Sequence, residues 1–135
     1  GYVFRMARAA VSWGSKKQVS IALSSCEAEI MAASEAAKEA VYLDRFAREL
    51  RMKDAAPVSR GMDNQGARDL AYNPEHHERT KHIERRHFFI RECVEDGKLT
   101  VPFVCTDDNL ADFLTKPLPA SRFFALRDRI MNVPT

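Results

Sequence analysis

The sequence has few cysteines, little net charge and no long apolar run, and each of these absences excludes a class of protein. Its three cysteines lie far apart among 135 residues. This argues against a disulfide framework and favours reduced thiols in an intracellular compartment. No apolar run approaches the roughly 18 residues of a membrane span and no signal peptide is visible, so we expect no membrane contact. The formal net charge is only +2, so binding to nucleic acid requires local basic clusters.

The composition, 45% hydrophobic and 30% charged, predicts one soluble domain over residues 1–135. Strands are expected at 2–6 and 9–13, joined by a turn at Ala7-Arg8, with a further extended piece at 19–23. A long helix capped by Ser24 or Ser25 should run to about Met52. The remaining elements are a strand at 58–62, helices at 65–72 and 82–95, a strand at 99–105, and helices at 109–116 and 120–132. This order predicts an α/β fold, a mixed sheet flanked by helices.

One carboxylate of the long helix falls on its apolar face. At about 100° per residue, a stripe of apolar residues lies within about 60° of Glu29. The stripe consists of Ala33, Ala36, Ala40, Leu43, Ala47 and Leu50. Glu27 lies about 160° away, on the expected solvent side. A buried acid needs a base, a hydrogen-bond network or a metal. The alternative for Glu29 is an acid at a helix start, stabilised by backbone N–H groups and the helix dipole.

Further acids lie at two places where expected strands meet helices. Asp63 follows the strand at 58–62, at the kind of strand end where ligands gather, although it could also cap the next helix. Asp107 and Asp108 are placed to cap the helix at 109–116, whereas Asp112 is too far inside it. Together Glu29, Asp63 and Asp112 suggest a carboxylate site for Mg²⁺ or Mn²⁺, because these cations prefer hard oxygen ligands.

A basic, histidine-containing segment precedes and includes the helix at 82–95. Its Arg79, Lys81, Arg85, Arg86 and Arg91 could follow a phosphate backbone. The alternative is a solvated basic face that Glu84 and Glu92 neutralise. The histidines lack the paired cysteines of structural zinc sites, so zinc is not expected. His87 shares a face with Ile83, Ile90 and Val94, which predicts a half-buried core histidine.

Four segments in order resemble one known family. They are "VSWGSKKQVSIALSSCEAEIMAASEAAKEA", "MDNQGARDLAYNP", "HERTKHIERRHFFIRE" and "LADFLTKPL". They are similar to the ribonuclease H domain of copia-type LTR retrotransposon Pol polyproteins, which lies C-terminal to reverse transcriptase. The resemblance runs from Gly1 to about Arg129. It implies an RNase H-like fold with a five-stranded mixed sheet, and hydrolysis of the RNA strand of RNA–DNA hybrids at a two-metal carboxylate site.

The resemblance also assigns roles to residues. The family's catalytic glutamate matches Glu29 in "CEAE", and two of its catalytic aspartates match Asp63 in "MDNQ" and Asp112 in "LADF". These three would hold Mg²⁺ or Mn²⁺. We further expect hybrid contacts from Lys16, Lys17, Asn64 and Gln65, together with Arg79, Lys81 and Arg85. Trp13 would lie near the hybrid groove or, alternatively, in the core.

The family's first strand and its catalytic aspartate have no counterpart, because the similarity begins at Gly1 and no acid precedes Glu27. The expectation is therefore an N-terminally truncated RNase H-like domain with reduced or no activity alone. The alternative is a catalytically impaired or host-adopted module that binds nucleic acid or a protein. The resemblance implies an upstream reverse transcriptase domain and a cytoplasmic, virus-like-particle or nuclear location. An open sheet edge would favour self-association.

Overall fold

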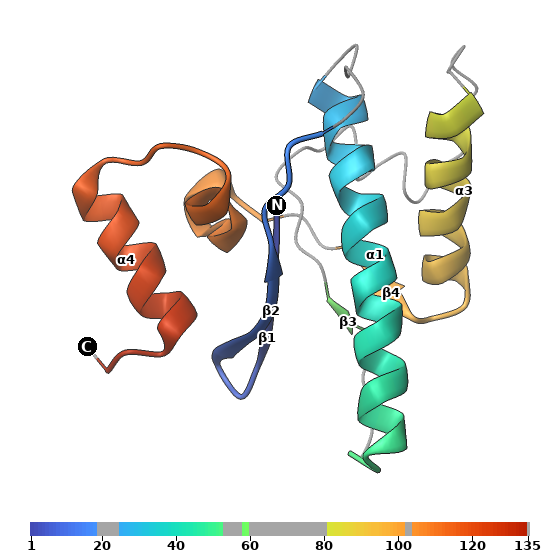
Figure 1. Ribbon diagram of the computed structural model, residues 1–135, viewed down its shortest axis with the longest axis horizontal. Helices are drawn as coiled ribbons and strands as arrows, with labels where there is room; N and C mark the ends of the chain where they lie inside the picture. Colours follow the sequence, from blue (N-terminus) through green and yellow to red (C-terminus); the bar gives the residue numbers. More distant parts are fainter. Residues whose placement is uncertain (19–24, 53–57, 60–80, 102–103, 135) are drawn as a thin grey trace. The chain divides into compact units, whose positions relative to one another are not determined.

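The structure is a computed structural model that describes residues 1–18, 25–52, 58–59, 81–101 and 104–134. Its contacts divide the chain into two compact units. The first unit combines Gly1–Val19 with Asp108–Thr135, and the second comprises Ser20–Asp107. Each unit contains a two-stranded sheet and at least one α-helix, so the chain is a mixed α/β protein (Figure 1). None of the helices in the described ranges is long and apolar enough to cross a membrane.

A β-hairpin opens the first unit. Strands β1 (Tyr2–Met6) and β2 (Ala9–Gly14) pair antiparallel, with an irregularity between Phe4 and Arg5. The two turn residues Ala7 and Arg8 have φ angles of 50° and 71°. Positive φ at both central residues suits the right-handed twist of a two-residue hairpin. The Arg5 guanidinium fastens the turn by donating to the Arg8 carbonyl at 2.6 and 3.2 Å.

The C-terminal segments pack onto this hairpin. They comprise the short 3₁₀ helix η2 (Leu110–Leu114) and helix α4 (Ala120–Met131), both in contact with the hairpin. Leu126 and Ile130 of α4 are buried one turn apart, and Phe4 is buried on β1. The Phe113 and Phe123 rings stack with centroids 4.7 Å apart. These apolar contacts position η2, which carries Asp112.

Helix α4 begins and ends as the sequence predicts. Pro119 precedes its first turn, and Asn132 follows its last turn in the left-handed conformation with φ 54°. Asparagine adopts this conformation more readily than most residues, which makes it a common helix terminator. The Val133 N–H then donates to the Asp128 carbonyl at 2.9 Å. The prediction of a closing helix at 120–132 is confirmed within one residue.

Two helices side by side form the core of the second unit. They are α1 (Ser25–Glu49) and α3 (Lys81–Glu95) (Figure 1). The buried residues of α1 are Ile30, Met31, Ala33, Ser34, Ala36, Ala37 and Ala40. From α3, His87, Ile90 and Cys93 are buried. Small alanine side chains let two helices approach closely, which explains why an alanine-rich helix suits this core. The predicted core position of His87 is confirmed, but its side chain is buried rather than half-buried.

The Arg86 guanidinium links the two helices. It donates to the Met31 carbonyl at 3.4 Å and to Glu35 Oε1 at 3.2 Å. A second sheet adjoins these helices, where β3 (Val58–Ser59) pairs parallel with β4 (Leu99–Thr100). Gly97, with φ 69°, ends α3 before β4, as the sequence predicts. Because β1 and β2 belong to one unit and β3 and β4 to the other, the single mixed sheet stays a prediction.

Several predicted boundaries are wrong. Helix α1 ends at Glu49 rather than near Met52, because Arg51 adopts a φ of 55°. The segment expected as a helix at 109–116 forms only the 3₁₀ helix η2 after a separate 3₁₀ turn η1 (Thr106–Asp108). Asn109 caps η2 instead of Asp107 or Asp108. Among the described residues of the strand expected at 99–105, only Leu99–Thr100 form β4. The pieces expected at 19–23 and 65–72 lie outside the described residues.

Candidate metal and nucleic-acid site

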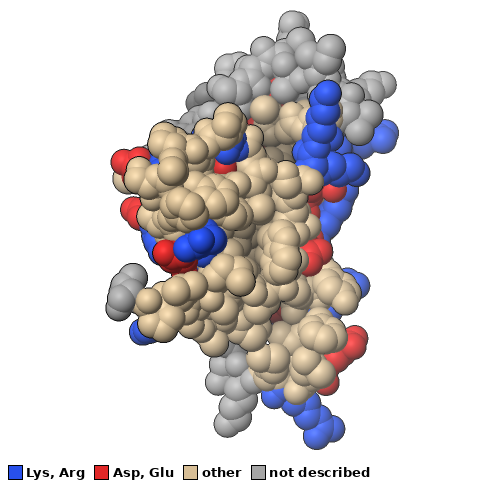
Figure 2. All heavy atoms as spheres, turned by 60° about the vertical axis from the view of Figure 1, so that its left-hand side comes forward, with Lys and Arg blue, Asp and Glu red and all other residues tan. Residues whose placement is uncertain are grey.

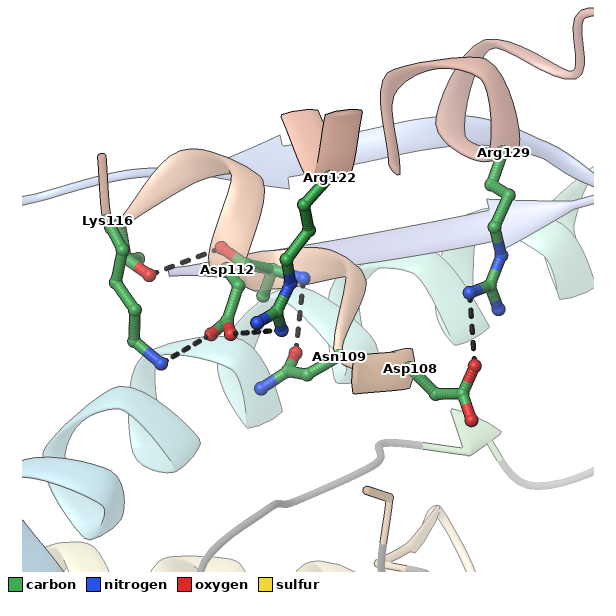
Figure 3. Close-up of polar contacts among 8 residues, drawn as sticks. Asp108, Asn109, Asp112, Lys116, Arg122 and Arg129 are labelled. Carbon is green, nitrogen blue, oxygen red and sulfur yellow. Dashed lines mark hydrogen bonds and ion pairs between the residues drawn. The ribbon is translucent and has the colours of Figure 1, made fainter. Parts of the chain in front are cut away.

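Asp112 is the most buried charged side chain in the described part of the chain, with 3% of its surface exposed. It lies in η2, whose start is fixed by Asn109. The Asn109 side chain accepts a hydrogen bond of 3.1 Å from the Ala111 N–H (Figure 3). Asn is among the preferred helix N-caps, because its side-chain oxygen satisfies an otherwise unbonded N–H. The cap therefore sets the orientation of η2 and of its carboxylate.

Two cationic side chains face the Asp112 carboxylate. Lys116 Nζ lies 2.9 Å from Oδ1, and Arg122 Nη2 lies 3.2 Å from Oδ2 (Figure 3). Lys116 follows η2, whereas Arg122 lies in the first turn of α4. Each carboxylate oxygen thus has its own cation, so the charge of the buried acid is balanced within the first unit. A buried carboxylate without such partners would be strongly unfavourable.

A second aspartate provides a contrast. Asp108 Oδ1 lies 3.1 Å from Arg129 Nη1, so it also pairs with an arginine of α4 (Figure 3). Both side chains of this pair are about half exposed or more. Solvent screens such an ion pair, which is worth at most about 1 kcal/mol. Asp112 and Asp108 therefore make the same kind of contact in very different surroundings.

Glu29 lies in the second turn of α1, in the second unit, and is half-buried. The stripe predicted beside it is confirmed for Ala33, Ala36 and Ala40, but Leu50 is exposed and lies beyond the helix. Glu27, expected on the solvent side, is half-buried as well. The buried face of α1 is wider than the predicted stripe, so periodicity alone does not distinguish Glu29 from Glu27.

The three predicted metal ligands do not lie within one described unit. Glu29 and Asp112 belong to different units, and Asp63 lies outside the described part. Within that part, no three His, Cys, Asp or Glu side chains form a group that could hold a metal ion. The donor chemistry nevertheless fits Mg²⁺ or Mn²⁺, since a buried, held carboxylate is a hard oxygen ligand. The metal triad therefore stays a prediction.

The predicted nucleic-acid contacts are described in part. Lys16 and Lys17 are exposed just after β2, and Arg85 is exposed on α3. Lys81 begins α3, but its side chain is outside the described part, as are Asn64, Gln65 and Arg79. Trp13 has 62% of its surface exposed, so its alternative place in the core is excluded.

Two other basic residues of α3 take part in ion pairs. Arg86 contacts Glu35 of α1, and Arg91 pairs with Glu95 at 3.0 Å. These contacts support the alternative of a neutralised helix face for Arg86 and Arg91, although the partners are not the predicted Glu84 and Glu92. On the face drawn in Figure 2, positive and negative side chains are interspersed with a larger area of uncharged residues.

Sequence reasoning missed Lys116 and Arg122. Lys116 lies four residues after Asp112, a spacing at which helical side chains often form ion pairs, so the sequence contained a signal for it. Arg122 lies ten residues from Asp112 in another helix. No local pattern predicts such a contact, because it depends on how α4 packs against η2.

Comparisons with known proteins identify a class of relative, the Pol polyproteins of plant retrotransposons. The chain is 45% identical over 123 residues to the retrovirus-related Pol polyprotein from transposon TNT 1-94 of Nicotiana tabacum. It is 38% identical over 136 aligned positions to that from transposon RE1 of Arabidopsis thaliana. These alignments cover 91% and 99% of the chain but only 9% of each polyprotein. The chain is therefore homologous to a short region of a retrotransposon Pol polyprotein.

A third relative is shorter. The secreted RxLR effector protein 161 of Plasmopara viticola is 58% identical over 43 residues, which are 32% of the chain and 30% of that protein. No family model matches the chain. No solved structure matches it either.

Proposed function

We propose that this chain is the ribonuclease H region of a copia-type retrotransposon Pol polyprotein and acts on RNA–DNA hybrids. The observation that carries the proposal is similarity to Pol polyproteins over almost the whole chain. The four sequence segments that resemble the copia-type ribonuclease H domain lie within this similarity. The order of the described elements is compatible with an RNase H-like fold: a hairpin, a long helix, two parallel strands separated in sequence by α3, and a C-terminal helix.

In this proposal Glu29, Asp63 and Asp112 would hold divalent cations. When bound, such cations supply an activated water and stabilise the leaving 3′-oxygen. The protein's contribution is to hold carboxylates in fixed places, and Asp112 meets this need because Asn109 fixes η2 and Arg122 fixes the carboxylate. Lys16, Lys17 and Arg85 would attract the phosphate backbone from the solvent-exposed surface.

The alternative is a module that binds nucleic acid without cutting it. One observation favours it. Both oxygens of Asp112 already have cationic partners. In this case the exposed Trp13 and the adjacent Lys16 and Lys17 would be the contact residues, since aromatic stacking combined with positive charge suits nucleic acid.

The test is cleavage of an RNA–DNA hybrid labelled on its RNA strand, in Mg²⁺ and in Mn²⁺, by the chain and by its Asp63→Asn variant. Cleavage by the chain that the variant loses supports the ribonuclease proposal. Hybrid binding without cleavage by either protein supports the binding module. Equal cleavage by both proteins contradicts the role of Asp63 and indicates a contaminating nuclease. A duplex of DNA alone serves as the substrate control.

A further inference from the structure

Asp112 is held differently from an ordinary surface acid, and the difference bears on how it would bind a metal. Its carboxylate is almost fully removed from solvent, with 4% of the side-chain surface exposed. Water therefore contributes little to balancing its charge. The balance comes from Lys116 on one oxygen and Arg122 on the other, at 2.9 and 3.2 Å.

The two cations differ in how firmly they are placed. The Arg122 side chain is 31% exposed and belongs to α4, which is anchored by the buried residues Leu126 and Ile130. The Lys116 side chain is 51% exposed and lies in the connection after η2. A half-exposed ammonium on a flexible stem can move into water at small cost, whereas a less exposed guanidinium on a packed helix moves at greater cost.

We propose that Arg122 and Lys116 form an internal counter-ion pair for Asp112, in which Arg122 positions the carboxylate and Lys116 competes with a divalent cation for Oδ1. This inference rests on the metal site in the proposed function. A cation approaching Oδ1 meets the Lys116 ammonium at the same atom, and like charges at that distance repel. Lys116 thus lowers the affinity of Asp112 for metal while it stabilises the metal-free protein.

The proposal predicts a specific effect of removing the Lys116 charge. Methionine has a similar length and keeps the apolar stem of lysine, so Lys116→Met removes the charge with little change in packing. Because the ammonium is half exposed and solvent screens it, we expect Mn²⁺ to bind about three- to tenfold more tightly to this variant. In Lys116→Met combined with Asp112→Asn, the gain should disappear.

Lys38 offers a matched control. Its ammonium lies 3.0 Å from Glu35 Oε1, and its side chain is 59% exposed. Lys38→Met therefore removes one positive charge and exposes one carboxylate, as Lys116→Met does, but on the surface of α1. We expect it to leave Mn²⁺ affinity unchanged. Thermal unfolding of each variant establishes that it is folded before metal is added.

The experiment is a Mn²⁺ titration of the 135-residue chain and these variants, without nucleic acid, followed by water proton relaxation and by calorimetry. Tighter binding in Lys116→Met alone, lost with Asp112→Asn, supports the counter-ion pair. The counter-ion pair is overturned if Lys116→Met binds Mn²⁺ no more tightly than the wild type, or if no variant binds Mn²⁺. It is also overturned if the tighter binding persists when Asp112→Asn is added, or if Lys38→Met gains as much affinity.

Hybrid cleavage by the same samples separates this inference from the proposed function. If Mn²⁺ affinity responds as expected but no sample cuts the hybrid, the counter-ion pair stands and the ribonuclease proposal fails. If the chain cuts the hybrid in an Asp63-dependent way and Lys116→Met leaves Mn²⁺ affinity unchanged, the ribonuclease proposal stands and the counter-ion pair fails.

Discussion

The Ser15 hydroxyl donates a hydrogen bond of 2.7 Å to the Leu114 carbonyl and so joins residues 99 positions apart in the chain. Ser15 directly follows β2, and Leu114 ends η2. The N-terminal hairpin and the C-terminal segments therefore belong to one compact unit, although the whole second unit separates them in sequence. Asp112 belongs to this unit, so its position depends on both ends of the chain.

Asp112 should contribute more to stability than Asp108. Asp112→Ala removes the buried carboxylate that faces Arg122 and Lys116. Loss of one partner of a buried ion pair destabilises a protein more than loss of a surface pair. Since both cations are partly exposed, we expect a loss of about 1–3 kcal/mol in the free energy of unfolding. Asp108→Ala breaks the exposed pair with Arg129 and should cost less than about 1 kcal/mol.

Urea unfolding followed by circular dichroism at pH 7, in the absence of divalent cations, compares these two variants. Equal losses would mean that burial does not distinguish the two aspartates. A gain in stability for Asp112→Ala would mean that other acids repel the Asp112 carboxylate. That result would contradict its contacts with two cations.

Substitutions in the hairpin turn should stabilise the protein. Ala7 and Arg8 have φ angles of 50° and 71°, where side chains with a Cβ are strained. Asn-Gly is the preferred pair for such a turn. Ala7→Asn with Arg8→Gly should therefore raise the free energy of unfolding by about 0.5–2 kcal/mol. The Arg5 contact with the residue-8 carbonyl involves backbone and survives the change.

Calorimetric melting of the double variant measures this gain. The matched comparison is Gly97→Ala, which places a Cβ at a φ of 69° after α3, where no other atom lies within 4 Å of it. It should lower the melting temperature, because only backbone strain changes there. An unchanged or lower melting temperature for the Asn-Gly variant would contradict the assigned turn geometry.

Sequence patterns predicted the helices and strands whose bounds depend on neighbouring residues in the chain. The hairpin strands, the start of α1, α3 with its terminal Gly97, and α4 all agree with apolar periodicity and with turn or capping residues. The end of α1 was misplaced because apolar residues continue to Leu50 and Met52, both of which are exposed. Periodicity reports that a residue is apolar, and it does not report whether another element covers it.

The candidate site was less predictable, for a related reason. The sequence pointed to Asp112 through its place in the "LADF" segment, but its surroundings depend on packing between η2 and α4. The short helix followed by Pro117 closes as a 3₁₀ helix with an Asn109 cap, a detail that propensity does not resolve. The contact with Arg122 is tertiary, so no periodic pattern contains it.

The free energy of unfolding should depend weakly on pH in the acid range because of Glu35. The hydrogen bond from Lys38, together with the nearby charges of Lys38 and Arg86, lowers the pKa of Glu35 from its usual value near 4.5. A lowered folded-state pKa stabilises the protein above the unfolded-state pKa, and this contribution disappears as the pH falls through the folded-state value. Because Glu35 is half exposed, the effect should be at most about 1 kcal/mol.

Glu35→Gln removes this titration. The variant should therefore lose less unfolding free energy than the wild type between pH 7 and pH 3, measured by urea unfolding at both values. The comparison variant is Glu84→Gln, which removes an exposed acid from the first turn of α3. If Glu35→Gln and the wild type lose equal free energy on acidification, the Lys38 and Arg86 contacts do not stabilise the charged form of Glu35.

Cys93 and Cys105 should differ sharply in reactivity. Cys93 is buried in the second unit with 3% of its surface exposed, whereas Cys105 is exposed. Burial raises the pKa of the Cys93 thiol, and the nearby Lys98 charge opposes this rise only in part. Thiolate is the reactive form, so burial slows the reaction of Cys93 in two ways, through the raised pKa of its thiol and through restricted access of the reagent. We expect Cys105 to react with iodoacetamide at least about tenfold faster than Cys93.

Peptide mass mapping after timed alkylation reports each cysteine separately. In 8 M urea the two rates should converge, because unfolding removes both the burial of Cys93 and the shift of its pKa. In the folded state reaction at Cys93 should stay slow, since access to the buried thiol requires opening of the α1–α3 core. Equal rates in the folded state would mean that this core opens as readily as the exposed segment around Cys105, which would contradict the close packing of α3 against α1.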